Sequence, residues 1–145
     1  MKQFIRIIIL LIMACISLCA CPEHEDEHRY ITIINQSDKE IAYQELINWS
    51  DTSFYCSSHS ISFLFNIPAN SSRMHEVNIR SSSWESYLNN GQIMDIFVAD
   101  AELYEEYWQQ PCDTIRKYVP ILHNYRLTLE DLQRMNWTVV YPPEE

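Results

Sequence analysis

Short runs of alternating and β-branched apolar residues recur along most of the chain, separated by turn-forming residues, and they predict a series of strands. The expected strands are 29–35, 40–47, 61–67, 74–79, 93–99, 118–127 and 137–141. Turn chemistry between the first two strands predicts that they pair as a hairpin. Segment 93–99 is the most strand-like run and is apolar enough to be a central strand.

Three further segments carry helix signals. Two of them open with the capping-box spacing, in which a serine or threonine precedes a carboxylate by three residues; the pairs are Ser82–Glu85 and Thr128–Asp131. They predict short helices at 84–88 and from residue 129, and Gly91 is expected to take a positive φ after the first. Segment 101–110 is a third expected helix, which Pro111 stops.

These elements together predict a mainly β fold, an antiparallel β-sandwich-like single domain with two or three short helices. An α+β fold is the alternative. The chain shows no internal repeat, and the roughly 125 residues that follow its N-terminal segment suit one domain with a modest core.

The first twenty residues follow a different pattern. Lys2 and Arg6 precede an apolar run over 7–20, and the polar segment 22–28 follows it. That run has 14 residues, whereas a helix that crosses a bilayer needs roughly 20. A short basic stretch before a short apolar one is typical of a secretory signal, so residues 1–20 are expected to be a signal peptide.

The end of this signal, Leu18-Cys19-Ala20-Cys21, resembles a bacterial lipobox, in which a cysteine is acylated and becomes the mature N-terminus. Cys21 fits best, because Ala20 precedes it and Leu18 lies three residues before it. Cys19 follows a leucine where a lipobox has a small residue, and Cys15 would leave an unusually short apolar run. The resemblance implies acyl chains such as palmitate on Cys21, through which the chain attaches to the membrane. The alternative is an ordinary secretory signal cleaved near Ala20.

Residues 21–28 are expected to be an acidic tether in front of a domain that spans 29–145. Four acidic residues and two histidines lie between Glu23 and His28, and so charged a stretch cannot offset its ordering entropy. It resembles the acidic export signal with which some Gram-negative gut anaerobes display lipoproteins on the outer face of the outer membrane. No metal site is predicted, because nothing fixes the geometry of His24 and His28.

Charge and glycine content exclude several functions. Without the signal, 8 basic residues face 20 acidic ones, a formal charge of −12. Such a surface repels nucleic-acid phosphates and anionic lipid head groups, so no nucleic-acid partner is expected and the lipid must supply membrane attachment. Gly91 is the single glycine, whereas phosphate-cradling and dinucleotide-binding loops need several, so no cofactor is predicted.

Cys56 and Cys112 are the cysteines that follow Cys21. Two cysteines in an exported chain predict one disulfide, and two buried free thiols are the alternative. Closing a loop of this length is worth about 4 kcal/mol in the chain-entropy model. Their spacing fits neither a CxxC redox motif nor a zinc site.

The polar residues do not predict catalysis. His59, His75 and His123 have no recurrent spacing, and the serines beside His59 lack a third partner. Three acidic pairs occur, Glu105–Glu106, Glu130–Asp131 and Glu144–Glu145. Solvated charge is their simpler interpretation, and carboxylates in a first helical turn favour its positive end. We therefore expect a protein that is not an enzyme.

Aromatic residues are the positive indication of binding. Trp49, Tyr104 and Trp108 are the candidates for stacking on a glycan or anchoring a protein partner. The alternative is that these rings form the core of a glycine-poor β domain.

Several motifs resemble a group of small lipoproteins of unassigned activity from Gram-negative gut anaerobes. They are Asn35-Gln36-Ser37-Asp38, Trp84-Glu85 before a strand ending in Asp100, and above all LTLEDLQRMNW-TVVYP at 127–142. The resemblance covers most of 30–143 and implies one folded unit in the cell envelope. We expect a surface-exposed outer-membrane lipoprotein that serves as a binding or accessory module for a protein or glycan; a small envelope hydrolase is the alternative.

Overall fold

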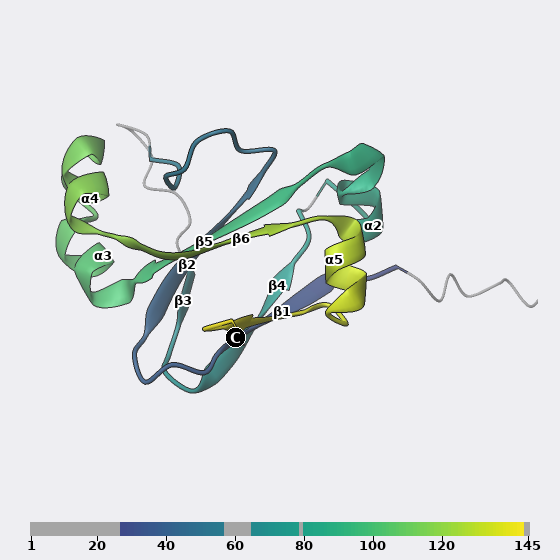
Figure 1. Cartoon of the computed structure of the whole chain (residues 1–145), viewed down its shortest axis with the longest axis horizontal. Helices are drawn as coiled ribbons and strands as arrows, with labels where there is room; N and C mark the ends of the chain where they lie inside the picture. The colour runs from purple at the N-terminus through teal and green to yellow at the C-terminus, as the bar shows by residue number, and fades with distance from the viewer. Residues whose placement is uncertain (1–26, 57–64, 79, 144–145) are drawn as a thin grey trace, which may run out of the picture.

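The structure, a computed structural model, describes residues 27–56, 65–78 and 80–143. These residues form two sheets that pack against each other, with short helices toward both ends of the long axis (Figure 1). Strand outweighs helix, 37% against 25%, and the chain forms one domain. The prediction of a mainly β, single-domain fold is therefore confirmed.

The two sheets differ in size. The three-stranded sheet has the order β4 (Ser71–Glu76), β1 (Tyr30–Asn35), β7 (Thr138–Tyr141), and the four-stranded sheet has the order β3 (Phe65–Ile67), β2 (Ile41–Ile47), β5 (Met94–Asp100), β6 (Ile121–Leu127). Neighbouring strands are antiparallel except β1 and β7, which run parallel. A long stretch of chain separates β1 from β7, so no tight turn forces these two to be antiparallel.

The predicted hairpin between segments 29–35 and 40–47 is wrong. β1 pairs with β4, and β2 pairs with β3 and β5, so the chain passes from one sheet to the other between these two strands. A second crossing, from β3 to β4, lies beside the first. The turn residues after β1 therefore form an arc between the sheets instead of a hairpin loop.

Asn35 explains why the turn joins two sheets. Its side chain is fully buried, and its amide nitrogen donates to the carbonyl oxygens of Lys39, at 2.7 Å, and Pro68, at 3.0 Å. The side-chain oxygen of Asn35, Oδ1, accepts a hydrogen bond from the backbone nitrogen of Ser37 at 3.0 Å. Asn35 thus links the two crossings to each other, and the polar atoms of its buried side chain all have hydrogen-bond partners.

The larger of two apolar clusters fills the space between the sheets. Alternate residues of β1, β2 and β5 point into it, as the period of two requires. Two helices, α2 (Trp84–Tyr87) and α5 (Leu129–Arg134), close it toward the right-hand end of Figure 1. Each contributes a fully buried side chain, Trp84 and Leu132.

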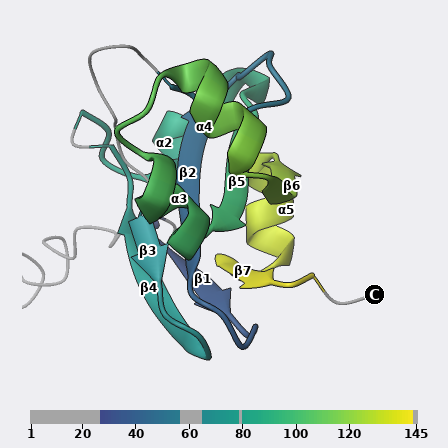
Figure 2. The ribbon, with the colours of Figure 1, turned by 90° about the vertical axis from the view of Figure 1, so that its left-hand side faces the viewer.

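The smaller cluster lies on the other face of the four-stranded sheet. Two helices, α3 (Ala101–Tyr107) and α4 (Cys112–Tyr118), cover β2 and β5 on this side (Figure 2). Its buried members are Phe54, Phe97, Ala99, Ile115 and Val119. Six of the seven residues of β5 are buried because both faces are covered, which confirms the prediction of a central strand.

The helix ends follow the sequence signals with one correction. The capping box between Thr128 and Asp131 is present and opens α5, as predicted. At α2 the N-cap is Ser83, not Ser82, because the Ser83 side chain accepts from the backbone nitrogen of Ser86 at 3.2 Å. Gly91, in the turn η1 (Asn89–Gly91), takes φ 76° as expected.

Several helix and strand boundaries differ from the predicted ones because of contacts between residues distant in the sequence. Helix α4 was not expected, and β6 starts at Ile121 rather than at residue 118. The apolar pair Ile115 and Val119 draws this segment onto the smaller cluster, which short-range signals do not reveal. β4 begins earlier than predicted because its first residue pairs with the end of β1. Of the expected strand 61–67, residues 61–64 lie outside the described residues and the remainder is β3.

Candidate functional site

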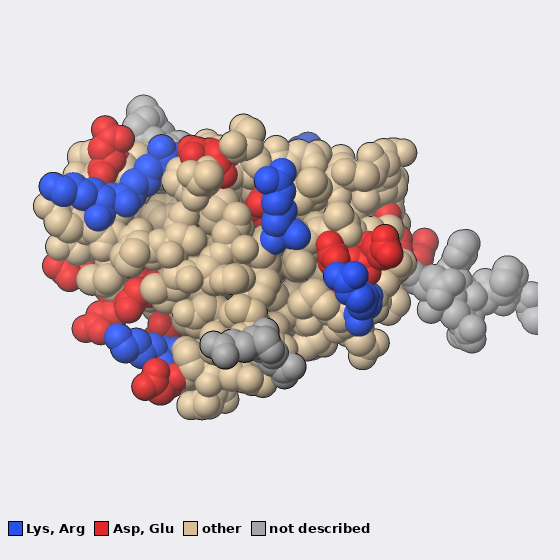
Figure 3. Space-filling view, in the orientation of Figure 1, with Lys and Arg blue, Asp and Glu red and all other residues tan. Residues whose placement is uncertain are grey.

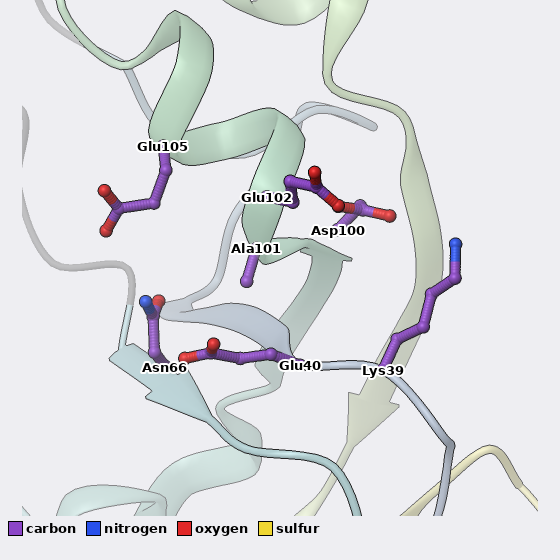
Figure 4. Close-up of a pocket in the computed structure, with 7 residues that line it drawn as sticks. All are labelled: Lys39, Glu40, Asn66, Asp100, Ala101, Glu102 and Glu105. Atoms are coloured by element: carbon purple, nitrogen blue, oxygen red, sulfur yellow. The ribbon is translucent and has the colours of Figure 1, made fainter.

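A cavity of about 580 Å³ opens where α3 begins. Its polar lining comes from three separate parts of the chain: the arc before β2, strand β3, and the end of β5 with the first turns of α3. Figure 4 shows these side chains, which are Lys39, Glu40, Asn66, Asp100, Glu102 and Glu105. This volume lies within the ordinary range of small-ligand sites.

Main-chain geometry holds the walls of this cavity in place. Asp100 ends β5 and caps α3, because its Oδ1 accepts from the backbone nitrogen of Leu103 at 3.1 Å. The backbone nitrogen of Ala101 donates to the carbonyl oxygen of Glu40 at 3.4 Å, which ties α3 to the start of β2. Two sequence-distant segments, the arc before β2 and the junction of β5 with α3, thus present carboxylates to one space, and β3 adds the Asn66 amide.

The cavity is acidic. Four carboxylates line it against one ammonium group, that of Lys39, and one amide, that of Asn66. Figure 3 shows acidic side chains at the end of the molecule where α3 lies, together with basic ones. Carboxylate and amide oxygens accept hydrogen bonds, so the lining suits a ligand rich in hydroxyl or amino groups. Among the described residues, no group of three or more His, Cys, Asp or Glu side chains is arranged to hold a metal ion.

Two of the three candidate aromatic residues pack against the smaller cluster, and the third is exposed. Trp49 packs against that cluster, and its Nε1 donates to the carbonyl oxygen of Ser53 at 2.7 Å. Tyr104 also packs there, and burial raises the pKa of its hydroxyl, with a further rise from Glu105. Trp108 is exposed, with 38% of its surface accessible. Of the three residues, Trp108 has the largest exposed fraction.

A second aromatic group joins α3 to α4. The rings of Tyr107 and Tyr118 stack with centroids 4.9 Å apart, and the Lys117 ammonium lies 4.9 Å from the Tyr118 centroid. Tyr118 is exposed, yet it is engaged by a ring and by a cation. Sequence reasoning missed this arrangement because α4 itself was not predicted.

The predicted disulfide between Cys56 and Cys112 is present, with Cα atoms 5.7 Å apart. It joins loop 48–56 to the start of α4. The guanidinium of Arg116 reinforces the join, since it lies 3.4 Å from the carbonyl oxygen of Phe54 and 3.7 Å from the Asp51 carboxylate. This end of the domain is therefore held by a covalent bond as well as by packing.

The described histidines have structural partners. His75 is buried between the sheets, where its Nδ1 lies 3.0 Å from the Tyr43 hydroxyl and its Nε2 lies 3.4 Å from a Glu45 oxygen. Burial raises the pKa of Tyr43 to about 12, while Arg73 lowers it in part. Because Tyr43 is fully buried, this chain of polar groups offers a substrate no access to the hydroxyl.

His123 and the acidic pairs complete the predicted residues. His123 packs edge-on against Tyr125 with centroids 4.4 Å apart. Glu105 lines the cavity, whereas Asp131 caps α5, and hydrogen bonds from the Thr128 backbone and hydroxyl lower the pKa of the Asp131 carboxyl. The predicted residues outside the described part of the chain are Cys21, His24, His59, Glu144 and Glu145.

A smaller groove of about 340 Å³ runs beside β7 and is lined mainly by Tyr125, Met135, Val140 and Pro143. The Tyr125 hydroxyl donates to the carbonyl oxygen of Val140, which links β6 to β7. This bond satisfies one carbonyl group of β7, a strand at the edge of its sheet.

Most of the cavity lining was not predicted. Glu40, Asn66, Asp100 and Glu102 come from segments far apart in the sequence, and no local spacing links them.

No described helix is long and apolar enough to cross a membrane. A comparison with known proteins found no family model, curated protein or solved structure that matches the chain.

Proposed function

We propose that this chain is an exported lipoprotein of the outer membrane, displayed at the cell surface, where it is a non-enzymatic binding or accessory module for an envelope protein or glycan. The observation that carries the proposal is the end of the domain formed by α3, α4 and loop 48–56. A disulfide holds this end together, and α3 carries both the polar cavity and the exposed Trp108.

The location is supported by two independent features. The N-terminal segment has the pattern of a lipoprotein signal that ends at Cys21. The Cys56–Cys112 disulfide fits an oxidising compartment, in which such bonds persist. A lipid on Cys21 anchors the chain without any membrane-spanning segment, provided that more than one acyl chain is attached.

The arrangement of the two ends supports display. The described chain enters the domain through β1 at the right of Figure 1, whereas α3 and α4 lie at the left. An anchor that pulls on the N-terminal segment therefore leaves α3 and α4 on the far side of the domain. This is the geometry that a surface binding module needs.

The chemistry of the outer end matches a polar ligand. Its carboxylate and amide oxygens accept hydrogen bonds from sugar hydroxyls or from lysine and arginine side chains. Trp108 follows Glu105 by three residues, so the two are neighbours on the surface of α3. An exposed indole beside hydrogen-bond acceptors suits the apolar face of a sugar or an anchoring contact with a protein.

The test is capture by the mature, lipidated chain. We would use it as bait on intact outer membranes and on a glycan array, beside Trp108→Ala and a Glu102→Gln, Glu105→Gln double variant. We expect both variants to weaken capture roughly tenfold. Glu130→Gln, on the exposed part of α5, is the matched control and should bind like the parent. Failure of the parent to bind any protein or glycan, or equal binding by the α3 variants, contradicts the proposal.

The anchor has its own test. Mass spectrometry of the mature protein should find an acylated N-terminal Cys21. A mature N-terminus without an acyl group would contradict the lipoprotein assignment, whatever the chain binds.

A further inference from the structure

We propose that His28 is a strap: it fixes the point at which the N-terminal segment leaves the domain and locks α2 to the turn between α5 and β7. The proposal concerns the domain itself and holds with or without a lipid. Its consequence for orientation at a membrane rests on the proposed function.

One side of the strap is bound to α2. The backbone nitrogen of His28 lies 3.0 Å from Glu85 Oε2, and its Nδ1 lies 2.7 Å from Glu85 Oε1. The carbonyl oxygen of His28 accepts from the backbone nitrogen of Trp84 at 2.8 Å. A carboxylate only accepts hydrogen bonds, so Nδ1 carries the proton. Three polar groups of one residue are thus engaged by a single four-residue helix.

The other side of the strap is the ring of Trp137. The imidazole of His28 stacks on the indole with centroids 4.1 Å apart and an angle of 16° between the planes. Trp137 is 9% exposed, whereas the His28 side chain is 41% exposed. His28 therefore forms a lid on a ring that belongs to the larger cluster.

The backbone of Trp137 is strained. It has φ 58°, and Asn136 before it has φ 50°. Asn136 is the ordinary left-handed residue that ends a helix: its nitrogen donates to Gln133 O, and Trp137 N donates to Leu132 O. A second left-handed residue with a bulky side chain is uncommon and persists where surrounding contacts require it. The His28 stack is one of those contacts.

The strap continues directly into the three-stranded sheet. Val77 N donates to the Arg29 carbonyl oxygen at 2.8 Å, and the Arg29 guanidinium pairs with Glu76 at 2.7 Å. Thr32 N donates to Trp137 O at 2.8 Å, beside the stacked ring. A displacement of His28 would therefore disturb contacts at α2, at the α5–β7 turn and at the start of β1. All three lie on the side of the domain away from α3 and α4.

The test is hydrogen exchange on the mature chain with Cys21→Ser, which removes the lipid from the question. We expect His28→Ala to speed exchange of the Trp84 and Trp137 amides roughly tenfold while the β2 and β5 amides keep their rates. His28→Phe preserves the stack and both backbone hydrogen bonds of residue 28 but loses the bond from Nδ1 to Glu85, so it should free α2 more than the turn. Glu85→Gln should do the same.

The matched control is His123→Ala, which removes another partly exposed ring that contacts an aromatic neighbour. It should leave the Trp84 and Trp137 amides unchanged. Equal acceleration of every amide in His28→Ala, or no change at either site, overturns the strap. Absence of an acyl group on Cys21 would instead remove the anchor and leave this result intact.

Discussion

The two ends of this domain are stabilised in different ways. The end that carries α2 and α5 rests on the larger cluster, which has 16 buried apolar members in the described part of the chain, from both sheets, both helices and the segments beside them. The end that carries α3 and α4 rests on the smaller cluster, which has 5 buried members among the described residues. Fewer fully buried side chains contribute less stability, and the disulfide adds to the stability of this end.

The two ends also differ in what they hold: one holds the N-terminal attachment, and the other holds the proposed binding surface. The end with the larger cluster receives the N-terminal segment, which His28 binds to α2 and to Trp137. The end that carries α3, α4 and the disulfide holds the cavity and Trp108, where partners of the proposed module would bind. Changes at one end should leave the other folded if the two clusters are independent, and the following predictions test that independence.

Trp84→Ala should have the largest effect. The ring is fully buried in the larger cluster and contacts the rings of His75 and Tyr87. Its removal leaves a cavity, so we expect a loss of about 4 kcal/mol in the free energy of unfolding. Urea denaturation measures this value. Trp108→Ala, at an exposed site, is the control and should change it by less than about 0.5 kcal/mol.

Replacing both disulfide cysteines by alanine, Cys56→Ala with Cys112→Ala, should cost about 3 kcal/mol. Hydrogen exchange should rise first in loop 48–56 and α4, while the amides of α2 stay protected. Chemical reduction of the parent should reproduce the result. Thiol labelling of both cysteines in denatured, unreduced parent would show that the bond does not form.

Asn35→Ala tests how the sheets are joined. The variant loses the hydrogen bonds from this amide to the carbonyl oxygens of Lys39, Ile67 and Pro68, which lie on both crossings. We expect a loss of about 2 kcal/mol, measured by urea denaturation. Asn89→Ala, at an exposed position, is the control. An effect no larger than that of the control would mean that the two crossings do not depend on Asn35.

Acid should weaken the α2 end through Glu85. Burial raises the pKa of this carboxyl, but hydrogen bonds from His28 and from backbone groups outweigh burial, so the pKa lies below its ordinary value. A depressed pKa in the folded state stabilises the fold above the unfolded-state pKa, and this contribution disappears as pH falls through the folded-state pKa. Glu85→Gln should therefore lose less stability than the parent below about pH 4. Urea denaturation of both proteins at several pH values measures this difference. An equal loss of unfolding free energy in both proteins as the pH falls would contradict this role.

Local signals predicted elements better than partners. The capping box at Thr128, the positive φ of Gly91 and the buried run of β5 follow from short-range spacing, and the structure contains all three. The hairpin prediction failed because alternation in β1 and β2 shows which side chains face inward but not which strand lies alongside. The cavity was unpredictable for the same reason, since its lining joins segments that no spacing relates.

By itself, the sequence determined most strands and the mainly β class, because these depend on composition and on neighbouring residues. It also predicted the pairing of Cys56 with Cys112, since these are the two cysteines that follow the expected signal. Only the tertiary structure decided that Asn35 joins two sheets, that α4 forms, and that His28 reaches Glu85 and Trp137. Those contacts join residues dozens of positions apart, and their free energy exists only once the two sheets have packed together.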